Sequence, residues 1–231
     1  MDIYLDSADI TQWTLPAGCP PVVGVTTNPS LVFQAGFPVN LASYERLVRA
    51  AGAAGMGQIM VQLPSNEVQT AHAWVEKLQA VAMQERVGLT IKLPCHPSWT
   101  ECIAAVKAMN QAILLTGLSN AVQLLWAQSL RADFVAPYVG RLAADSSHGG
   151  RDVWALMQAC VAAQTAQAPH AGPQLLAASI KSADVLARLM GMGAAAVTLP
   201  PASLIAWSQD AVTDAAMAQF ERDIAASQAL G

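Results

Sequence analysis

Residues 88–95 read Gly88-Leu-Thr-Ile-Lys-Leu-Pro-Cys95 and place a lysine, Lys92, inside an apolar run rich in β-forming residues. This run, bounded by glycine and proline, predicts a buried strand that ends near Pro94. Burying an unpaired ammonium group is costly, and burial favours the neutral amine. A neutral amine in a pocket can form a Schiff base with a carbonyl substrate. The alternative is a structural lysine whose head reaches solvent at the strand end.

The same pattern of a short apolar run closed by a polar or turn residue recurs along the chain. With residues 89–93, eight such runs are expected, the others being 3–5, 22–27, 58–63, 112–115, 134–139, 175–178 and 195–199. Longer segments with helical spacing lie between them, at 43–54, 65–86, 98–108, 119–130, 150–167, 182–190 and 210–230. Ser65 is the expected N-cap of the second of these helices. The connection 30–40 is expected to be a lid or an interface loop.

Strands that alternate with helices predict an α/β fold with a parallel sheet. Eight such units in 231 residues fit a closed (β/α)8 barrel, the TIM barrel, better than an open sheet. We see no linker or change in composition, so residues 1–231 are expected to form a single domain.

Polar residues follow the predicted strands at their carboxyl ends, and in this architecture that face carries the active site. The residues in question are Asp6, Thr27, Asn28, Gln62, Lys92, Thr116, Tyr138, Arg141 and Ser179. If the eight strands form one barrel, these side chains converge on a pocket around Lys92. Thr90 shares a strand face with Lys92 and should lie deeper in the barrel. This convergence favours a functional lysine over a structural one.

Each candidate also has a structural interpretation. Asp6 could exchange protons with a substrate hydroxyl, or it could cap a helix that starts near Ser7. Tyr138 could act as a general acid and base through a water held by Gln62 and Thr116. Alternatively, these three polar groups satisfy one another at the barrel mouth.

The binding candidates have alternatives of the same kind. Asn28, followed by proline, could be a turn residue. Arg141 and Ser179 are suited to binding a phosphate, and Lys181 either assists them or is solvated.

Composition excludes several function classes. The net charge is −4 with no basic run, so neither a nucleic acid nor an anionic membrane is an expected partner. Charged residues make up only 12% and apolar residues 54%, which indicates either subunit interfaces or an alanine-rich exterior. We expect no signal peptide, and no apolar stretch approaches about 20 residues.

Cofactor and metal motifs are also lacking. The four cysteines, Cys19, Cys95, Cys102 and Cys160, form no Cys-x-x-Cys pair, so reduced cytoplasmic thiols are expected. Cys95-His96 lacks further metal ligands, and Gly191-Met-Gly193 lacks the third glycine of a dinucleotide fingerprint. We therefore expect no metal and no cofactor.

Five motifs occur together in consistent order up to about Pro200. They are Tyr4-Leu-Asp6, Gly24-Val-Thr-Thr-Asn-Pro-Ser30, Ile91-Lys-Leu-Pro94, Val135-Ala-Pro-Tyr-Val-Gly-Arg141 and Ala177-Ala-Ser179. Together they resemble the transaldolase family, and in particular its short branch that includes fructose-6-phosphate aldolase.

The resemblance implies a class I aldolase in which Lys92 forms an imine with a dihydroxyacetone-like ketone donor. By similarity, Asp6, Thr27 and Asn28 engage substrate hydroxyls. Tyr138, Gln62 and Thr116 hold the water that moves protons. The phosphate of an acceptor such as glyceraldehyde 3-phosphate is bound by Arg141 and Ser179, with Lys181 beside them.

Gln62 takes the place of the glutamate found in transaldolases proper, which favours aldol addition and cleavage by an aldehyde-lyase over group transfer. The resemblance also implies a homo-oligomer, a pentamer or decamer, in which the helix at about 210–230 packs on a neighbouring subunit. Three segments depart from the family pattern: 95–98, 142–150 and 180–181.

Three hypotheses follow for a protein that binds a sugar or sugar phosphate. The first is a Schiff-base aldolase of the fructose-6-phosphate aldolase type. The second is a transaldolase that transfers the dihydroxyacetone group between sugar phosphates. The third, of another class, is a non-catalytic barrel that binds sugar phosphates.

Overall fold

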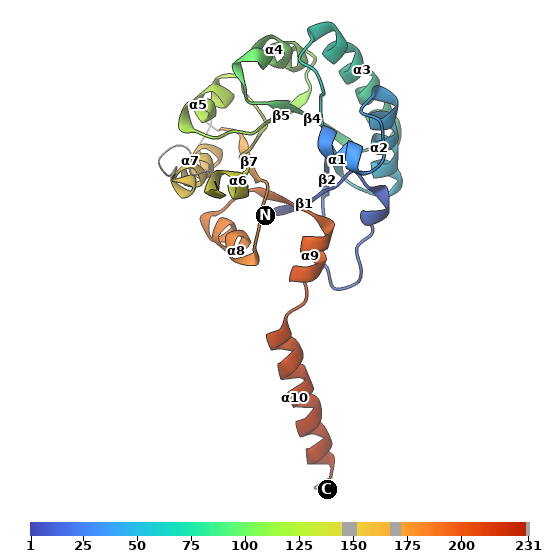
Figure 1. Cartoon of the computed structure of the whole chain (residues 1–231), viewed down its shortest axis with the longest axis vertical. Helices are drawn as coiled ribbons and strands as arrows, with labels where there is room; N and C mark the ends of the chain where they lie inside the picture. The colour runs from blue at the N-terminus through green and yellow to red at the C-terminus, as the bar shows by residue number, and fades with distance from the viewer. Residues whose placement is uncertain (145–151, 167–171, 230–231) are drawn as a thin grey trace.

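The computed structural model describes residues 1–144, 152–166 and 172–229. Eight parallel strands, hydrogen-bonded in chain order, close into a barrel surrounded by helices (Figure 1). The strands are β1 (Asp2–Asp6), β2 (Gly24–Thr26), β3 (Gln58–Gln62), β4 (Gly88–Pro94), β5 (Ala112–Thr116), β6 (Phe134–Ala136), β7 (Gln174–Ala177) and β8 (Ala196–Leu199). The predicted (β/α)8 barrel is therefore confirmed.

Helices follow the strands, and those before α10 surround the barrel (Figure 1). They are α1 (Pro29–Gln34), α2 (Leu41–Ala53), α3 (Val68–Glu85), α4 (Thr100–Ala108), α5 (Ala121–Ser129), α6 (Val139–Ala144), α7 (Val153–Thr165), α8 (Ala183–Met192), α9 (Pro201–Trp207) and α10 (Ala211–Gln228). Two short 3-10 helices, η1 (Ile10–Gln12) and η2 (Pro97–Trp99), precede α1 and α4. The last helix, α10, extends away from the barrel and carries the C-terminus far from it (Figure 1).

Local differences from the sequence prediction concern element ends. The stretch 30–40, predicted as a loop, contains most of α1, because Pro29 fits the first turn of a helix that Asn28 caps. Ser65 does not cap α3; the Glu67 carboxylate does, accepting from the backbone N–H groups of Gln69 and Thr70. β6 ends at Ala136, three residues early, because Pro137 has no N–H to donate.

Two apolar cores hold the barrel. The larger one lies between the strands and the helices, whereas a smaller cluster lies inside the barrel, formed by Tyr4, Met60, Leu114, Ala136, Leu176 and Ala196. Thr90 is fully buried, as its parity with Lys92 predicts, and accepts a hydrogen bond of 2.7 Å from Gln58 Nε2. The Tyr4 hydroxyl donates to Gln58 Oε1. These apolar and paired polar groups fill the barrel below the level of Lys92.

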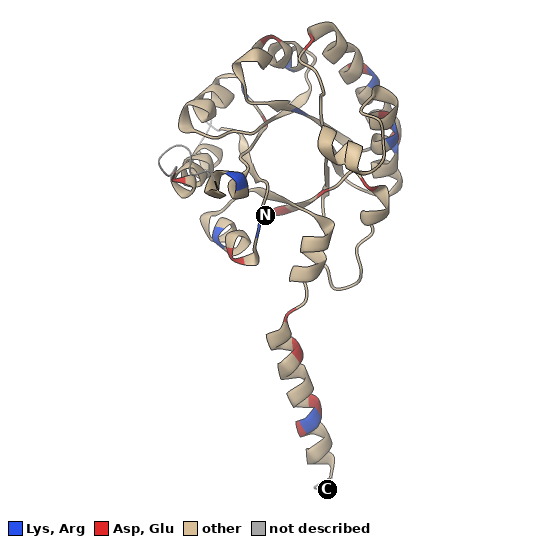
Figure 2. Cartoon of the chain, viewed as in Figure 1, with Lys and Arg blue, Asp and Glu red and all other residues tan. Residues whose placement is uncertain are grey.

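Charged residues are sparse on the outside of the barrel (Figure 2). Apolar side chains are exposed on several helices instead, including Val122 and Leu125 on α5 and Met83 on α3. Helix α10 has no buried residue at all. Within the parts of the chain that the structure describes, every helix is too short or too polar to cross a bilayer.

Candidate active site

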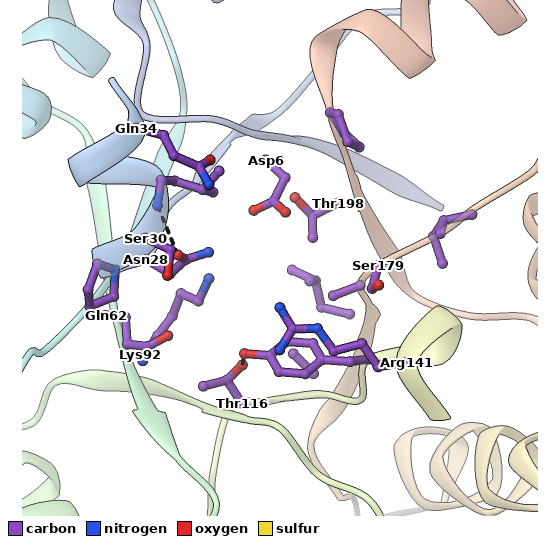
Figure 3. A pocket seen from close by; sticks show the side chains of 18 of the residues that line it. Asp6, Asn28, Ser30, Gln34, Gln62, Lys92, Thr116, Arg141, Ser179 and Thr198 are labelled. Atoms are coloured by element: carbon purple, nitrogen blue, oxygen red, sulfur yellow. Dashed lines mark hydrogen bonds between the residues drawn. The ribbon is translucent and has the colours of Figure 1, made fainter. Parts of the chain in front are cut away.

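A cavity of about 590 Å³ lies at the carboxyl ends of the barrel strands. Its polar lining consists of Asp6, Asn28, Ser30, Gln34, Gln62, Lys92, Thr116, Tyr138, Arg141, Ser179, Lys181 and Thr198. Figure 3 shows that the labelled side chains of this set point into a common space. The structure thus brings together all the predicted site residues except Thr27.

Lys92 lies in the wall of this cavity and is only 6% exposed. It is paired with Gln62 across β3 and β4, so the two side chains lie at the same level of the barrel. Its Nζ donates a hydrogen bond of 2.8 Å to the backbone carbonyl oxygen of Thr27. Burial lowers the pKa of Lys92 below its ordinary value, and the nearby Asp6 carboxylate opposes this effect. A buried amine with a lowered pKa at the wall of a cavity is a candidate nucleophile.

Thr27 itself differs from the prediction. It does not line the cavity; its backbone carbonyl holds Lys92, while its hydroxyl is buried without a partner among the described residues. The reason is strand parity: Thr26 points into the barrel, where it contacts Asp6, so the next side chain points outward. The predicted contact between Thr27 and a substrate is thus not supported by the geometry.

Asp6 ends β1 and receives a hydrogen bond of 2.8 Å from Thr26 Oγ1. The structural alternative, in which Asp6 caps a helix near Ser7, is wrong. η1 begins at Ile10, and its cap is Asp9, whose carboxylate accepts from the N–H of Thr11. The Asp6 carboxylate is therefore free of a capping role and faces the cavity.

Tyr138 and Thr116 form a polar pair in the cavity wall. Thr116 Oγ1 donates to the Tyr138 hydroxyl oxygen at 2.7 Å, so the phenolic proton remains available to another acceptor. The Arg141 guanidinium lies over the Tyr138 ring, 4.8 Å from its centroid, in a cation–π contact. A phenolic hydroxyl that is held by a neighbouring hydroxyl at the wall of a cavity can pass a proton to a bound molecule.

Asn28 caps a helix and also lines the cavity. Its Oδ1 caps α1 by accepting from the N–H of Leu31 at 3.1 Å. The same side chain lines the cavity, where its amide nitrogen remains as a donor (Figure 3). Capping therefore fixes the orientation of Asn28 at the site.

Arg141, Ser179 and Lys181 gather at one side of the cavity, on α6 and on the loop after β7. Ser179 has a left-handed backbone (φ 60°), and its carbonyl accepts from the N–H of Gly140 at 3.0 Å. A Cβ on Gly140 would lie 2.4 Å from that oxygen and 2.7 Å from Lys181 Cγ. Close packing of a glycine thus positions two cations and a hydroxyl, a set suited to an anion.

Ser30, Gln34 and Thr198 line the cavity although the sequence did not lead us to predict them. Thr198 could have been found, because it lies one residue before the end of the eighth predicted strand and has inward parity. Gln34 could not, since the sequence pattern predicts a loop there. Residues 145–151, which include most of the unusual loop 142–150, lie outside the described part of the chain. Among the described residues, no three His, Cys, Asp or Glu side chains are close enough to hold a metal ion.

A family model described as Transaldolase/Fructose-6-phosphate aldolase matches residues 3–231. The chain belongs to this family. Membership supports an aldolase-type enzyme that acts on sugar phosphates, in agreement with the resemblance found in the sequence.

Solved structures with the same architecture include two of flavocytochrome b2. One is a variant with sulfite bound (12% identity, TM-score 0.58, 90% of this chain and 59% of that one). The other is the flavin-binding domain of the baker's yeast protein (12% identity, TM-score 0.59, 90% of this chain and 58% of that one). A designed cube-shaped protein cage matches at 12% identity and TM-score 0.51, over 99% of this chain and 78% of that one. The transaldolase-family chain thus spans under two thirds of the flavocytochromes, and these likenesses concern the fold alone.

Proposed function

We propose that this protein is a class I aldolase that joins a dihydroxyacetone-like ketone to an aldehyde through a Schiff base on Lys92. The observation that carries the proposal is the buried Lys92 amine, with its lowered pKa, in a cavity whose other walls offer Asp6, Tyr138 and a cluster of cations. Burial supplies the nucleophile, and the polar walls supply proton transfer and substrate binding.

In the proposed reaction the Lys92 nitrogen attacks the ketone carbon, and the carbonyl oxygen leaves as water to give an iminium ion. Loss of a proton from the neighbouring carbon gives an enamine. The enamine carbon then attacks the aldehyde carbon, whose oxygen takes up a proton. Water finally releases the product and regenerates the amine. The reverse sequence cleaves the same bond.

Two groups are placed to move the protons. The Tyr138 hydroxyl, oriented by Thr116, serves the carbon next to the imine, directly or through a water near Gln62. The Asp6 carboxylate lies across the cavity from Thr116 (Figure 3) and serves the hydroxyls of the donor and the imine-forming step. Asn28 donates to a donor hydroxyl through its free amide nitrogen.

The acceptor end is assigned to Arg141, Ser179 and Lys181. An aldehyde that carries a phosphate would place its anionic group against the two cations, while its carbonyl lies toward Lys92. This arrangement supports a phosphorylated acceptor such as glyceraldehyde 3-phosphate. Group transfer between sugar phosphates is the second candidate; the glutamine at position 62, where transaldolases proper carry glutamate, favours aldol cleavage.

The decisive test is borohydride reduction in the presence of dihydroxyacetone, followed by peptide mass spectrometry. A stable adduct on Lys92 is expected in the wild type, with none in Lys92→Met. A folded wild type that remains unmodified at Lys92 would overturn the proposal. Thermal stabilisation by phosphate without turnover, in both wild type and Lys92→Ala, would instead favour a non-catalytic binding barrel.

A further inference from the structure

We propose that Thr26 and Thr198 are positioning residues for Asp6, which fix one carboxylate oxygen and leave the other to the substrate. This inference rests on the proposed function of the site, in which Asp6 acts in its ionised form. Neither threonine belongs to the set of residues that the sequence motifs indicated as functional, although Thr26 lies within one of the motifs.

The three residues come from three adjacent strands of the barrel. Asp6 of β1 is paired in register with Thr26 of β2, and β8 adjoins β1 on the other side. Thr26 Oγ1 lies 2.8 Å from Asp6 Oδ1 and 2.7 Å from Thr198 Oγ1. The two threonines are 0% and 2% exposed, so water cannot readily replace these contacts.

Proton counting gives the chain of hydrogen bonds a single direction when Asp6 is ionised. A carboxylate has no proton and can only accept, so the hydrogen of Thr26 must point to Asp6 Oδ1. The Thr26 oxygen then acts as an acceptor, and the hydrogen of Thr198 must point to Thr26. Each donor polarises the next, and a hydrogen bond to a charged acceptor is stronger than a neutral one.

Two consequences follow for the site. The bond to Oδ1 restrains rotation of the carboxylate, so Oδ2 keeps a constant direction toward the cavity that Asp6 lines. Asp6 also shares the cavity with titratable or cationic groups on four other elements, which are Lys92 on β4, Tyr138 after β6, Arg141 on α6 and Lys181 after β7. Unlike these groups, Thr26 is neither titratable nor cationic. Its hydroxyl donates a hydrogen bond to Asp6 and accepts one from the hydroxyl of Thr198.

A purely structural role is the alternative, because buried hydroxyls inside a barrel also need partners. Thr90 provides the matched control. It is another fully buried threonine inside the barrel, it is bonded to Gln58, and it has no contact with Asp6. Replacement of threonine by valine keeps the shape and removes the hydroxyl at each of the three positions.

The experiment compares Thr26→Val, Thr26→Ser, Thr198→Val and Thr90→Val. The measurements are melting temperature, kcat/KM against pH for cleavage of fructose 6-phosphate, and adduct formation on Lys92 with dihydroxyacetone and borohydride. We expect Thr26→Val to lower kcat/KM about tenfold or more at neutral pH and to displace the acidic limb of the pH profile, because the Asp6 carboxylate loses the donor that orients it. Thr198→Val should give a smaller change in the same direction, and Thr26→Ser should restore the wild-type profile.

Thr90→Val should lower the melting temperature and leave the pH profile in place. The inference is overturned if Thr26→Val and Thr198→Val behave like Thr90→Val, with stability changed and the acidic limb unmoved. If Thr26→Val does not fold, the profile of Thr198→Val decides in the same way. A wild type without an adduct on Lys92 marks failure of the proposed function, whereas a normal adduct with an unmoved limb marks failure of this inference alone.

Discussion

The Lys92 amine and the Thr27 carbonyl oxygen are 2.8 Å apart, so a hydrogen bond ties β4 to the residue that follows β2. A neutral amine that donates one hydrogen to this carbonyl has its lone pair directed away from the bond. The amine therefore keeps a lone pair for a carbonyl substrate in the cavity that Lys92 lines. The same bond offsets part of the cost of burying the amine.

The first prediction concerns the ionisation of Lys92. Burial lowers its pKa, so competitive labelling with acetic anhydride should show Lys92 becoming reactive at a pH below the ordinary lysine value of 10.5. Asp6→Asn should move the midpoint to still lower pH, because the Asp6 carboxylate raises the pKa of Lys92. Lys77, exposed on α3, is the internal reference in the same digest. An upward shift in Asp6→Asn would contradict the assigned electrostatics.

The second prediction concerns stability. Lys92→Met should abolish activity and raise the melting temperature at neutral pH, because the cost of burying the amine exceeds that of one lost hydrogen bond, about 1 kcal/mol. A gain of about 1 kcal/mol corresponds to about 2–4 °C in a chain of this size.

The sign of the pH dependence follows from the lowered pKa. Between that pKa and 10.5 the unfolded chain binds the proton more tightly than the native chain, so wild-type stability rises with pH. The slope is at most about 1.4 kcal/mol per pH unit. The advantage of Lys92→Met should therefore be largest below this window and decrease as the pH rises through it. Denaturation by urea at several pH values measures this, and a constant advantage across the series would contradict it.

The sequence predicted the fold and the convergence of the polar side chains correctly where a polar residue stands at the end of a regular apolar run. The barrel, the position of Lys92 and the convergence of Asp6, Gln62 and Tyr138 all followed from polar residues at the ends of apolar runs. Thr27 does not line the cavity, because the motif does not tell which of two consecutive threonines points into the barrel, and in the structure it is Thr26. Gln34 was missed because α1 owes its existence to a cap and a proline rather than to an amphipathic pattern. A short helix that is stabilised by its cap shows almost no repeating pattern of apolar residues in the sequence.

The third prediction tests the anion site through its packing. Gly140→Ala would place a Cβ 2.4 Å from the Ser179 carbonyl oxygen, so residues 179–181 must move. We expect competitive inhibition by inorganic phosphate to weaken at least about tenfold, with adduct formation on Lys92 preserved. Gly191→Ala is the control, because a Cβ at that position would meet no neighbouring atom within 4 Å and alanine favours helix α8. Equal phosphate inhibition in both variants would exclude this placement of the acceptor phosphate.

The fourth prediction separates imine formation from proton transfer. Tyr138→Phe removes the hydroxyl that Thr116 orients and leaves the ring under Arg141 in place. We expect kcat to fall by about 10²–10⁴, the usual contribution of a general acid or base, while the borohydride adduct on Lys92 still forms. Thr116→Val should show a smaller loss in kcat. A variant with full activity would remove Tyr138 from the proposed mechanism.

The last prediction concerns α10, which we expect to pack on a neighbouring subunit. The helix contributes nothing to the core of its own barrel, since none of its residues is buried. Yet Met217, Phe220 and Ile224 are 56–62% exposed and lie at helical spacing on one face. Exposed apolar side chains at this spacing indicate a helix whose partner is a different surface.

Removal of residues 211–231 should therefore leave the barrel folded and change its assembly. We expect the melting transition and the circular dichroism of the barrel to persist, while light scattering reports a smaller particle than the full-length protein. The variant with Met217, Phe220 and Ile224 all changed to Ser keeps the helix length and tests the apolar face itself. A similar variant at Val122 and Leu125, exposed on α5, is the matched control for lost surface apolarity. If truncation leaves the particle size unchanged, α10 has no role in assembly.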